Sequence, residues 1–315
     1  ANAVGKKEGE GPLRTCFDYI AEDDTFGQSA WEKAEQTMQK QALTLALDKC
    51  SLAVSDLDFL FAGDLLNQCI GSSYAARGQD VPFFGLYGAC STMGEGMILA
   101  AMALDGGFGA HAAVCASSHF CSAERQYRTP LEYGGQRTPT AQWTVTGAGA
   151  VILGAKGAGP CITHATVGKV VDMGIKDANN MGAAMAPAAL KTIKTHLEDL
   201  STSPDAYDLI VTGDLGKLGK ECLLALARTE GLALGGKLED CGTLVFDLEK
   251  QDVHSGGSGC GCSAITLCSD LLNKLQSGKL KKILFCGTGA LLSPTSVQQG
   301  LPICSICHAV SIYGG

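Results

Sequence analysis

The sequence has little charge, few aromatic residues and no long hydrophobic run. Charged residues make up 18% of the 315 residues and aromatic residues 6%. Lysine and arginine number 24 against 32 acids and form no basic stripe. Nucleic acid is therefore excluded as the main partner, because nothing would neutralise its phosphates. No apolar run approaches the length of a membrane span and no signal-peptide pattern opens the chain, so we expect a soluble protein.

Glycine, cysteine and apolar residues are what the sequence has in quantity. Apolar residues make up 46%, and there are 41 glycines. This composition is typical of a compact α/β protein whose elements pack closely through small residues. The 15 cysteines are odd in number and irregularly spaced, which suits a reducing cytosol better than a disulfide framework.

The same order of elements occurs twice along the chain. Residues 57–65 and 207–215 both read as a short apolar strand ending in Gly-Asp-Leu, 150 residues apart (208 minus 58). Each is followed by a Gly-rich helix start and a second apolar strand. This repeat predicts a duplication with halves 1–158 and 159–315, each built from βαβ units. Asp64 and Asp214 occupy equivalent positions, for which a structural role such as capping the next turn is the simpler interpretation.

Residues 81–118 organise the first half. They read as a strand, a sharp turn at 88–92, a small-residue helix at 93–104 and a strand at 110–115. Cys90 then lies at a helix N-terminus, where the dipole favours a thiolate or a bound anion. The alternative is a buried cysteine with no special role. We expect small residues to let this helix pack against its counterpart after residue 260. Residues 1–29 show no periodicity and read as a loop, followed by a helix over 29–49.

Seven stretches spread over nearly the whole chain resemble one family. These stretches are KEGEGPL at 7–13, AGDLLNQ at 62–68, GACST at 88–92, AERQ at 123–126, EYGGQ at 132–136, MAPAA at 185–189 and TGALLSP at 288–294. They closely resemble the stage V sporulation protein AD family, which has the thiolase fold of thiolases and ketoacyl synthases. The resemblance implies an α/β protein in which two duplicated βαβ-type halves form a layered α/β/α/β/α core.

The resemblance also implies a role in the bacterial endospore. Members of that family bind dipicolinic acid (pyridine-2,6-dicarboxylate) and take part in its uptake into the developing spore and its release at germination. The expected location is the cytoplasmic face of the inner spore membrane, as a peripheral protein beside other stage V sporulation A proteins. A homodimer through an edge strand of the first half is expected, with residues 112–118 as the candidate edge. Calcium enters only as the counter-ion of the ligand, and no other cofactor is implied.

Condensing enzymes of this fold activate their cysteine with a pair of histidines or a histidine and an asparagine. Cys90 matches the nucleophile, but Asp214 stands where a ketoacyl synthase has histidine, and the later Gly-rich loop offers Cys260. Because a carboxylate cannot donate the N–H that stabilises an oxyanion, we predict a binding pocket without catalytic residues. An active condensing enzyme using Cys90 stays open as the alternative if His254 or His308 reaches the thiol. A scaffold with a vestigial pocket is a third possibility.

A small dianion needs hydrogen-bond donors and fixed positive charge. Polar residues at the carboxyl ends of the strands are the natural candidates. Three arginines lie in or beside the long excursion at 123–145, although each alone is more simply read as a surface ion pair. The candidate ligand-binding residues are Cys90, Ser91, Thr92, Ser117, Ser118, His119, Arg125, Arg128, Arg137, Asp214, Ser258 and Cys260.

Two cysteine patterns near the C-terminal end suggest other chemistry. Cys304, Cys307 and His308 have the spacing of a c-type haem attachment site. Cys260 and Cys262 together with the first pair would supply four zinc ligands. No second feature supports either site, so we predict no metal.

Overall fold

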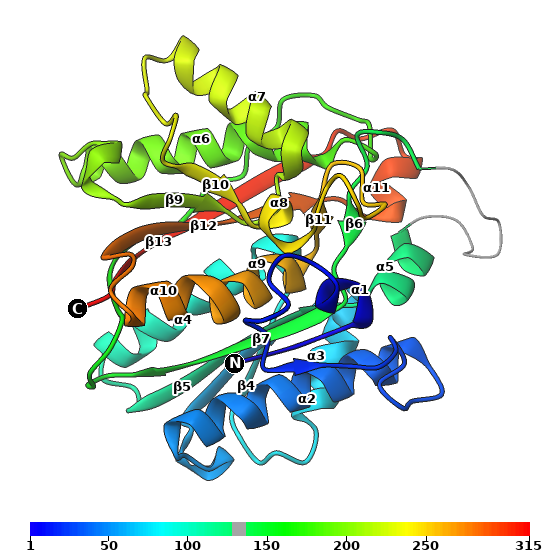
Figure 1. Ribbon diagram of the computed structural model, residues 1–315, viewed down its shortest axis with the longest axis vertical. Coiled ribbons are helices and arrows are strands. Elements are labelled where there is room, and N and C mark those ends of the chain that lie inside the picture. Colours follow the sequence, from blue (N-terminus) through cyan, green and yellow to red (C-terminus); the bar gives the residue numbers. More distant parts are fainter. Residues whose placement is uncertain (128–136) are drawn as a thin grey trace.

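Two β-sheets face each other across a layer of helices in this computed structural model, which describes residues 1–127 and 137–315 (Figure 1). Further helices cover the outer face of each sheet, so the layers run helix, sheet, helix, sheet, helix. This is the layered arrangement that the sequence predicts.

The first sheet has the strand order β2-β1-β7-β5-β3-β4. Strands β4, β3 and β5 are parallel to one another, and β7 runs antiparallel to β5. The strands are β1 (Asn2–Val4), β2 (Tyr19–Ile20), β3 (Phe59–Gly63), β4 (Phe83–Leu86), β5 (His111–Ser118) and β7 (Gly147–Gly154).

The second sheet repeats this pattern with the order β10-β9-β12-β13-β8. Strands β10, β9 and β12 are parallel, and β13 runs antiparallel to β12. The strands are β8 (Cys161–Thr166), β9 (Leu209–Thr212), β10 (Leu238–Asp240), β12 (Lys282–Leu291) and β13 (Cys304–Tyr313). A separate parallel pair joins the halves, formed by β6 (Trp143–Thr144) and β11 (Gly257–Ser258).

The helices divide between the middle layer and the two outer layers (Figure 1). The middle layer holds α4 (Thr92–Asp105), α9 (Cys260–Thr266) and α10 (Leu272–Gln276), the last two joined by a π-helical turn at Leu267–Leu271. The outer layers are α2 (Trp31–Cys50) with α3 (Ile70–Ala76), and α6 (Met181–Asp199) with α7 (Gly216–Thr229). The short helices are α1 (Lys6–Gly9), α5 (Phe120–Tyr127), α8 (Cys241–Val245) and α11 (Pro294–Gln298).

Amphipathic spacing explains why the outer helices lie on the sheets. In α2, Ala34, Met38, Ala42 and Ala46 recur every fourth residue, and all four are buried. Such a stripe forms one apolar face along a helix, which fixes the side that packs on the first sheet.

Small residues of the middle layer meet the sheets instead of the opposite helix. A Cβ atom on Gly149 of β7 would lie 2.5 Å from the carbonyl of Ala264 in α9. Gly94 of α4 and Gly287 of β12 form a similar close approach, in which a Cβ on Gly287 would lie 3.2 Å from the Gly94 Cα. The expectation that these residues join the two helices is therefore corrected: they let each helix approach the other half's sheet.

Two further expectations from the sequence are wrong. Residues 1–29 are not simply a loop, because β1, α1 and β2 lie within them and β1 pairs with the distant β7. A three-residue strand is too short to show a period. Residues 112–118 are not an edge, since β5 lies between β3 and β7, and its small apolar residues are buried on both faces. The edge next to it in the chain is β4.

Candidate functional site

Cys90 lies where the two halves meet, at the start of α4. A single 3₁₀ turn (Ala89–Ser91) follows β4 and leads directly into the helix, as the sequence predicts. Ala89 has a φ of 52°, a left-handed conformation that a residue with a side chain adopts at a cost. This turn carries the Cys90 side chain into the interior, where it is buried.

Asp214 is the main partner of Cys90. Its side chain is fully buried at the end of β9 and accepts a hydrogen bond from the Cys90 thiol. Its Oδ1 accepts from the Thr288 hydroxyl at 2.9 Å, and its Oδ2 accepts from the Gly259 amide at 3.0 Å. Burial raises the pKa of Asp214 to about 7, against the hydrogen bonds from Cys90 and Gly259 that lower it. The carboxyl group is thus held from both halves.

The surroundings of Cys90 disfavour a thiolate. Burial is the main cause that raises the pKa of the Cys90 thiol well above its usual range, and the Asp214 charge and Cys260 raise it further. Only the Gly259 amide opposes them among the strongest influences. The helix N-terminus alone suggested an activated thiol. Desolvation and a facing carboxylate reverse that prediction, because both penalise a second negative charge.

Cys260 closes the site from the second half. Its thiol donates to the Ala89 carbonyl at 2.9 Å and lies 3.7 Å from the Thr92 hydroxyl. Thr92 also donates to the Ala89 carbonyl at 2.6 Å, and the Ser91 hydroxyl donates to the Gly88 carbonyl at 2.6 Å. The structure therefore brings Cys90, Asp214, Cys260 and Thr92 together, with their polar atoms bonded to one another or to nearby backbone.

The predicted residues at the end of β5 are occupied by structural contacts. Ser118 donates to the Val145 carbonyl at 2.6 Å and accepts from the Gly261 amide, while Ser117 donates to Glu35 at 2.9 Å. The Nε2 of His119 bonds the Asp24 carbonyl at 2.7 Å, and burial lowers the pKa of His119. Ser258 is buried in β11, beside the Gly259 amide that bonds Asp214.

The arginines do not converge as a trio. Arg125 is half-exposed, forms an ion pair with Glu32 and lies over the Trp31 ring. Arg137 instead contacts Asp252 through its side chain and carbonyl at 3.0 and 2.9 Å. Arg128 lies outside the described residues. Arg125 therefore has the surface ion pair that the simpler interpretation gave it.

The two histidines that could have activated Cys90 have other partners. His254 lies 3.3 Å from Asp252. His308 accepts a hydrogen bond from the Gly168 amide at 3.2 Å, and burial lowers its pKa. Neither is among the groups that act most strongly on the Cys90 thiol.

The first half contains its own version of this acid site. Asp64, the repeat counterpart of Asp214, accepts from the Leu66 amide at 2.9 Å and from the amide and hydroxyl of Ser72 at 2.7 and 2.6 Å. Burial and the nearby Asp64 raise the pKa of Glu35, and Gln39 bridges Ser72 and Ser117. The predicted turn-capping role of Asp64 is confirmed.

Sequence reasoning missed two residues that hold Asp214. Thr288 lies 171 residues after Ser117 (288 minus 117), the same offset that relates the two apolar strands, so the repeat itself would have found it. Gln142 donates through one nitrogen to the carbonyls of Asp214 and Gly257 at 2.7 and 2.8 Å. No local pattern marks Gln142, because its role depends on the long-range pairing of β6 with β11.

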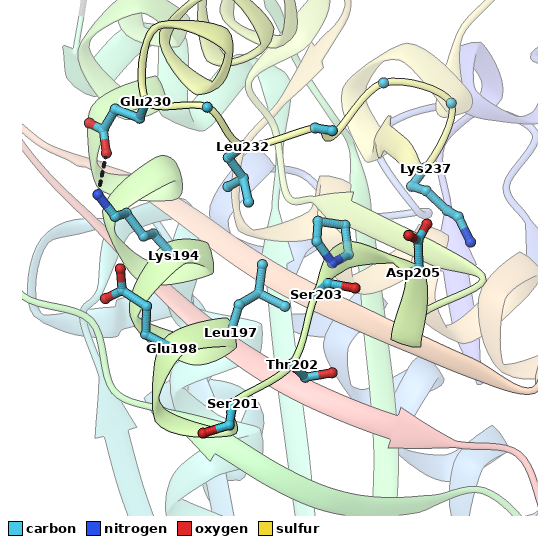
Figure 2. Close-up of a pocket in the computed structure, with 15 residues that line it drawn as sticks. Lys194, Leu197, Glu198, Ser201, Thr202, Ser203, Asp205, Glu230, Leu232 and Lys237 are labelled. Atoms are coloured by element: carbon cyan, nitrogen blue, oxygen red, sulfur yellow. Dashed lines mark hydrogen bonds and ion pairs between the residues drawn. The ribbon is translucent and has the colours of Figure 1, made fainter.

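A surface hollow of about 750 Å³ lies in the second half, away from Cys90. Figure 2 shows it between the end of α6, the turn after that helix and the loop that follows α7. Leu197 and Leu232 point inward, and Lys194 pairs with Glu230 at 2.7 Å across one end. Its lining contains no cysteine or histidine, so it offers no nucleophile or imidazole.

Metal and membrane features were sought in the same coordinates. Within residues 1–127 and 137–315, no three histidine, cysteine or acidic side chains lie in an arrangement that would hold a metal ion. No helix in the described part of the chain combines the length and the apolar character needed to cross a membrane.

Solved structures similar to this chain are condensing enzymes. AbyA1, a tetronic acid condensing enzyme, matches with a TM-score of 0.58 and 15% identity over 89% of this chain and 86% of its own. The 3-oxoacyl-[acyl-carrier-protein] synthase III of Aquifex aeolicus VF5 matches with a TM-score of 0.56 and 15% identity over 99% and 97%. A cerulenin-containing OleA variant of Xanthomonas campestris matches with a TM-score of 0.58 and 14% identity over 88% and 79%. At these identities the likeness shows the fold alone.

Sequence comparison is more specific than the structural likeness. The chain is 46% identical over 308 residues to Stage V sporulation protein AD of Bacillus subtilis (strain 168), which covers 98% of this chain and 91% of that protein. The family model for Stage V sporulation protein AD (SpoVAD) matches residues 1–313. The chain therefore belongs to the Stage V sporulation protein AD family and has the thiolase fold of the condensing enzymes.

Proposed function

We propose that this chain is a non-catalytic thiolase-fold protein that binds dipicolinic acid and takes part in its uptake into the developing spore and its release at germination. Membership of the sporulation family supports the biological role and the choice of ligand. The observation that carries the non-catalytic part is the contact between Cys90 and the buried Asp214.

Condensation would need a thiolate nucleophile and N–H donors for the developing oxyanion. Cys90 has a raised pKa and donates its proton to a carboxyl group. Both oxygens of Asp214 already accept other hydrogen bonds, from Thr288 and Gly259. A group in this state neither takes the thiol proton efficiently nor donates to a substrate, so loss of acyl transfer is the expected consequence.

Calorimetry with dipicolinate, benzoate and acetyl-CoA tests the proposal. We expect heat of binding with dipicolinate and none with acetyl-CoA. No dipicolinate binding at millimolar ligand would contradict the proposed ligand.

The second candidate is an active acyl-CoA or acyl-carrier-protein condensing enzyme that uses Cys90. It is favoured by the retained cysteine at the helix start and by the condensing enzymes among the similar structures. Intact mass after incubation with acetyl-CoA separates the two functions. An acyl adduct that disappears in Cys90→Ala would establish the enzyme, whereas an unchanged mass supports the binding protein.

The proposed setting is the cytoplasmic face of the inner spore membrane, where the chain would act as a peripheral partner of other stage V sporulation A proteins. Family membership is the support for this placement. Fractionation of spores followed by co-purification with membrane subunits would test it. Recovery of the protein in the soluble fraction under gentle extraction, without those subunits, would contradict it.

A homodimer through β4 is the proposed oligomeric state. Strand β4 ends the first sheet, and Phe84 and Tyr87 beside its free edge are 51% and 50% exposed. An unprotected edge strand with apolar side chains pairs readily with a second copy related by a twofold axis. Sedimentation should give a dimer that Phe84→Asp converts to a monomer, while Met173→Asp, at another exposed apolar position, leaves it intact. A monomeric parent protein would overturn this assignment.

A further inference from the structure

Three side chains converge on the indole ring of Trp143 in β6. The Phe120 ring stacks on one face, with centroids 3.8 Å apart and an interplanar angle of 8°. The Lys7 ammonium lies 3.6 Å from the ring centroid, so it must cover the opposite face. The Arg137 guanidinium carbon lies 4.7 Å from the same centroid. Two cations from distant parts of the chain thus share one aromatic ring.

The positive charge of this group is only partly balanced. Lys7 and Arg137 both donate to the Asp252 carbonyl, at 3.1 and 2.9 Å. The Asp252 carboxylate contacts Arg137 at 3.0 Å and His254 at 3.3 Å, but it is 79% exposed. Burial and then the Arg137 charge lower the pKa of Lys7, and the acids around it oppose this more weakly. One solvated carboxylate therefore serves two cations that repel each other.

Arg137 also carries an unused donor. Its side chain is only 15% exposed, and its Nη1 is buried without a hydrogen-bond acceptor among the residues that the structure describes. Nearly all buried donors in proteins are paired, and leaving one unpaired costs about 1 to 3 kcal/mol. An orphan guanidinium nitrogen beside a second cation is what an incoming anion would satisfy.

The position of this group connects it with the buried acid site. Trp143 pairs with Gly257 in the small sheet, and the preceding residue, Gln142, donates to the Asp214 carbonyl. Figure 1 shows α1, which carries Lys7, near the β6–β11 pair and α5. The cations therefore lie near the surface on the same strand pair that contacts Asp214 further in.

We propose that Lys7 and Arg137 form a binding site for a carboxylate anion, and that this site receives one carboxylate of the dicarboxylic ligand. The second clause rests on the proposed function. The ligand oxygens would accept from the Arg137 Nη1 and the Lys7 ammonium, which together offer a planar donor and a point charge. Asp252 would then swing into solvent, since its exposed side chain competes for the same cations.

Calorimetric titration with dipicolinate, and separately with benzoate, tests the site. We expect Lys7→Gln and Arg137→Gln each to weaken dipicolinate binding by about tenfold or more, as loss of a charge-assisted hydrogen bond would do. Arg77→Gln is the matched control, because it removes the same charge from another cation–aromatic pair, over Tyr74. Asp252→Asn should tighten binding by removing the competitor. Thermal unfolding of each variant shows whether it is folded.

The outcomes separate the site from the proposed function. If dipicolinate binds equally well to the parent and to the folded Lys7 and Arg137 variants, the site is wrong and the function stands. If dipicolinate does not bind but benzoate does, and only with both cations present, the site stands and the proposed ligand is wrong. Weaker binding in Asp252→Asn would overturn the site, since it would assign Asp252 to the ligand instead of against it. Binding of neither anion overturns both proposals.

Discussion

Asp64 and Asp214 occupy the same place in the two halves of the molecule, yet they serve different partners. Both are buried, and burial raises the pKa of each. Asp64 bonds to residues of its own half, chiefly Ser72, whereas Asp214 reaches across to the thiol of Cys90. A duplicated acid has thus kept a structural role in one copy and faces the former nucleophile position in the other.

The comparison extends to the residues that hold each acid. Thr288 and Ser117 are equivalent positions on β12 and β5, but Thr288 donates to Asp214 while Ser117 donates to Glu35. The first half satisfies its acids within a network of hydroxyl and amide groups. The second half uses a thiol and a backbone amide at the boundary between halves. This difference can be tested by changes made in matched pairs.

The largest expected effect is the pH dependence of stability. Burial raises the pKa of Glu8, in the first half, to about 8 and that of Asp214 to about 7, from ordinary values of 4.5 and 3.8. The folded state therefore holds protons that the unfolded chain has lost. Stability should be greatest at low pH and should fall as pH rises through these values, by about 1.4 kcal/mol per pH unit and group.

Chemical denaturation at a series of pH values separates the two acids. Asp214→Asn should flatten the profile up to about pH 7, and Glu8→Gln should flatten it up to about pH 8. A parent protein whose stability rises between pH 5 and 7 would contradict the raised pKa values, on the linkage sign given above.

The two central helices approach the opposite sheets unequally, which predicts unequal cost. Gly149→Ala would place a methyl group 2.5 Å from the Ala264 carbonyl, whereas Gly287→Ala meets Gly94 at 3.2 Å. We expect losses of about 3 and about 1 kcal/mol in the free energy of unfolding, because only the first forces backbone to move. Urea denaturation measures both, and equal losses would show that the two approaches are equally tight.

An imidazole at the two equivalent positions would sharpen the comparison of the acids. Asp214→His should speed modification of Cys90 by iodoacetamide about tenfold, because an imidazole takes the thiol proton and its cation stabilises a thiolate. Asp64→His is the matched control and should leave the rate unchanged. Peptide mass mapping measures the modification. An unchanged rate in Asp214→His would mean that burial, and not the carboxyl group, keeps the thiol inert.

The smallest expected effect is one in which the halves should agree. Ser51 and Ser201 follow the outer helices α2 and α6 at equivalent positions, with left-handed φ values of 55° and 48°. Glycine adopts this conformation without strain, so each Ser→Gly change should raise stability by about 0.5 kcal/mol. A gain in only one of the two variants, measured by thermal unfolding, would reveal a difference in how the helices end.

The order of elements could be predicted from sequence because each half repeats the same alternation of apolar strands and amphipathic helices. The first 29 residues could not, since β1 is held by pairing with β7, almost 150 residues away. The internal position of β5 was likewise hidden, because small apolar residues suit both a central strand and an edge that a second copy covers.

The candidate site was predictable in its outline but not in its chemistry. The repeat and the position of Cys90 indicated that this residue, Asp214 and Cys260 would meet, and they do. His119 and Arg125 failed to join them because their side chains turn to Asp24 and Glu32, a direction that sequence spacing does not determine. The thiolate prediction failed for the same reason, since burial is a property of the tertiary structure.

The position of β13 has a consequence for synthesis of the protein. This strand is the last along the chain, but it lies between β12 and β8, and it is the strand with which β8 pairs. On the ribosome the first sheet has all its strands once Gly154 has emerged, whereas β8 waits without a neighbour until residues 304–313 are released. The nascent second half therefore exposes open strand edges for about half of translation, when a chaperone or early pairing with another chain would matter most.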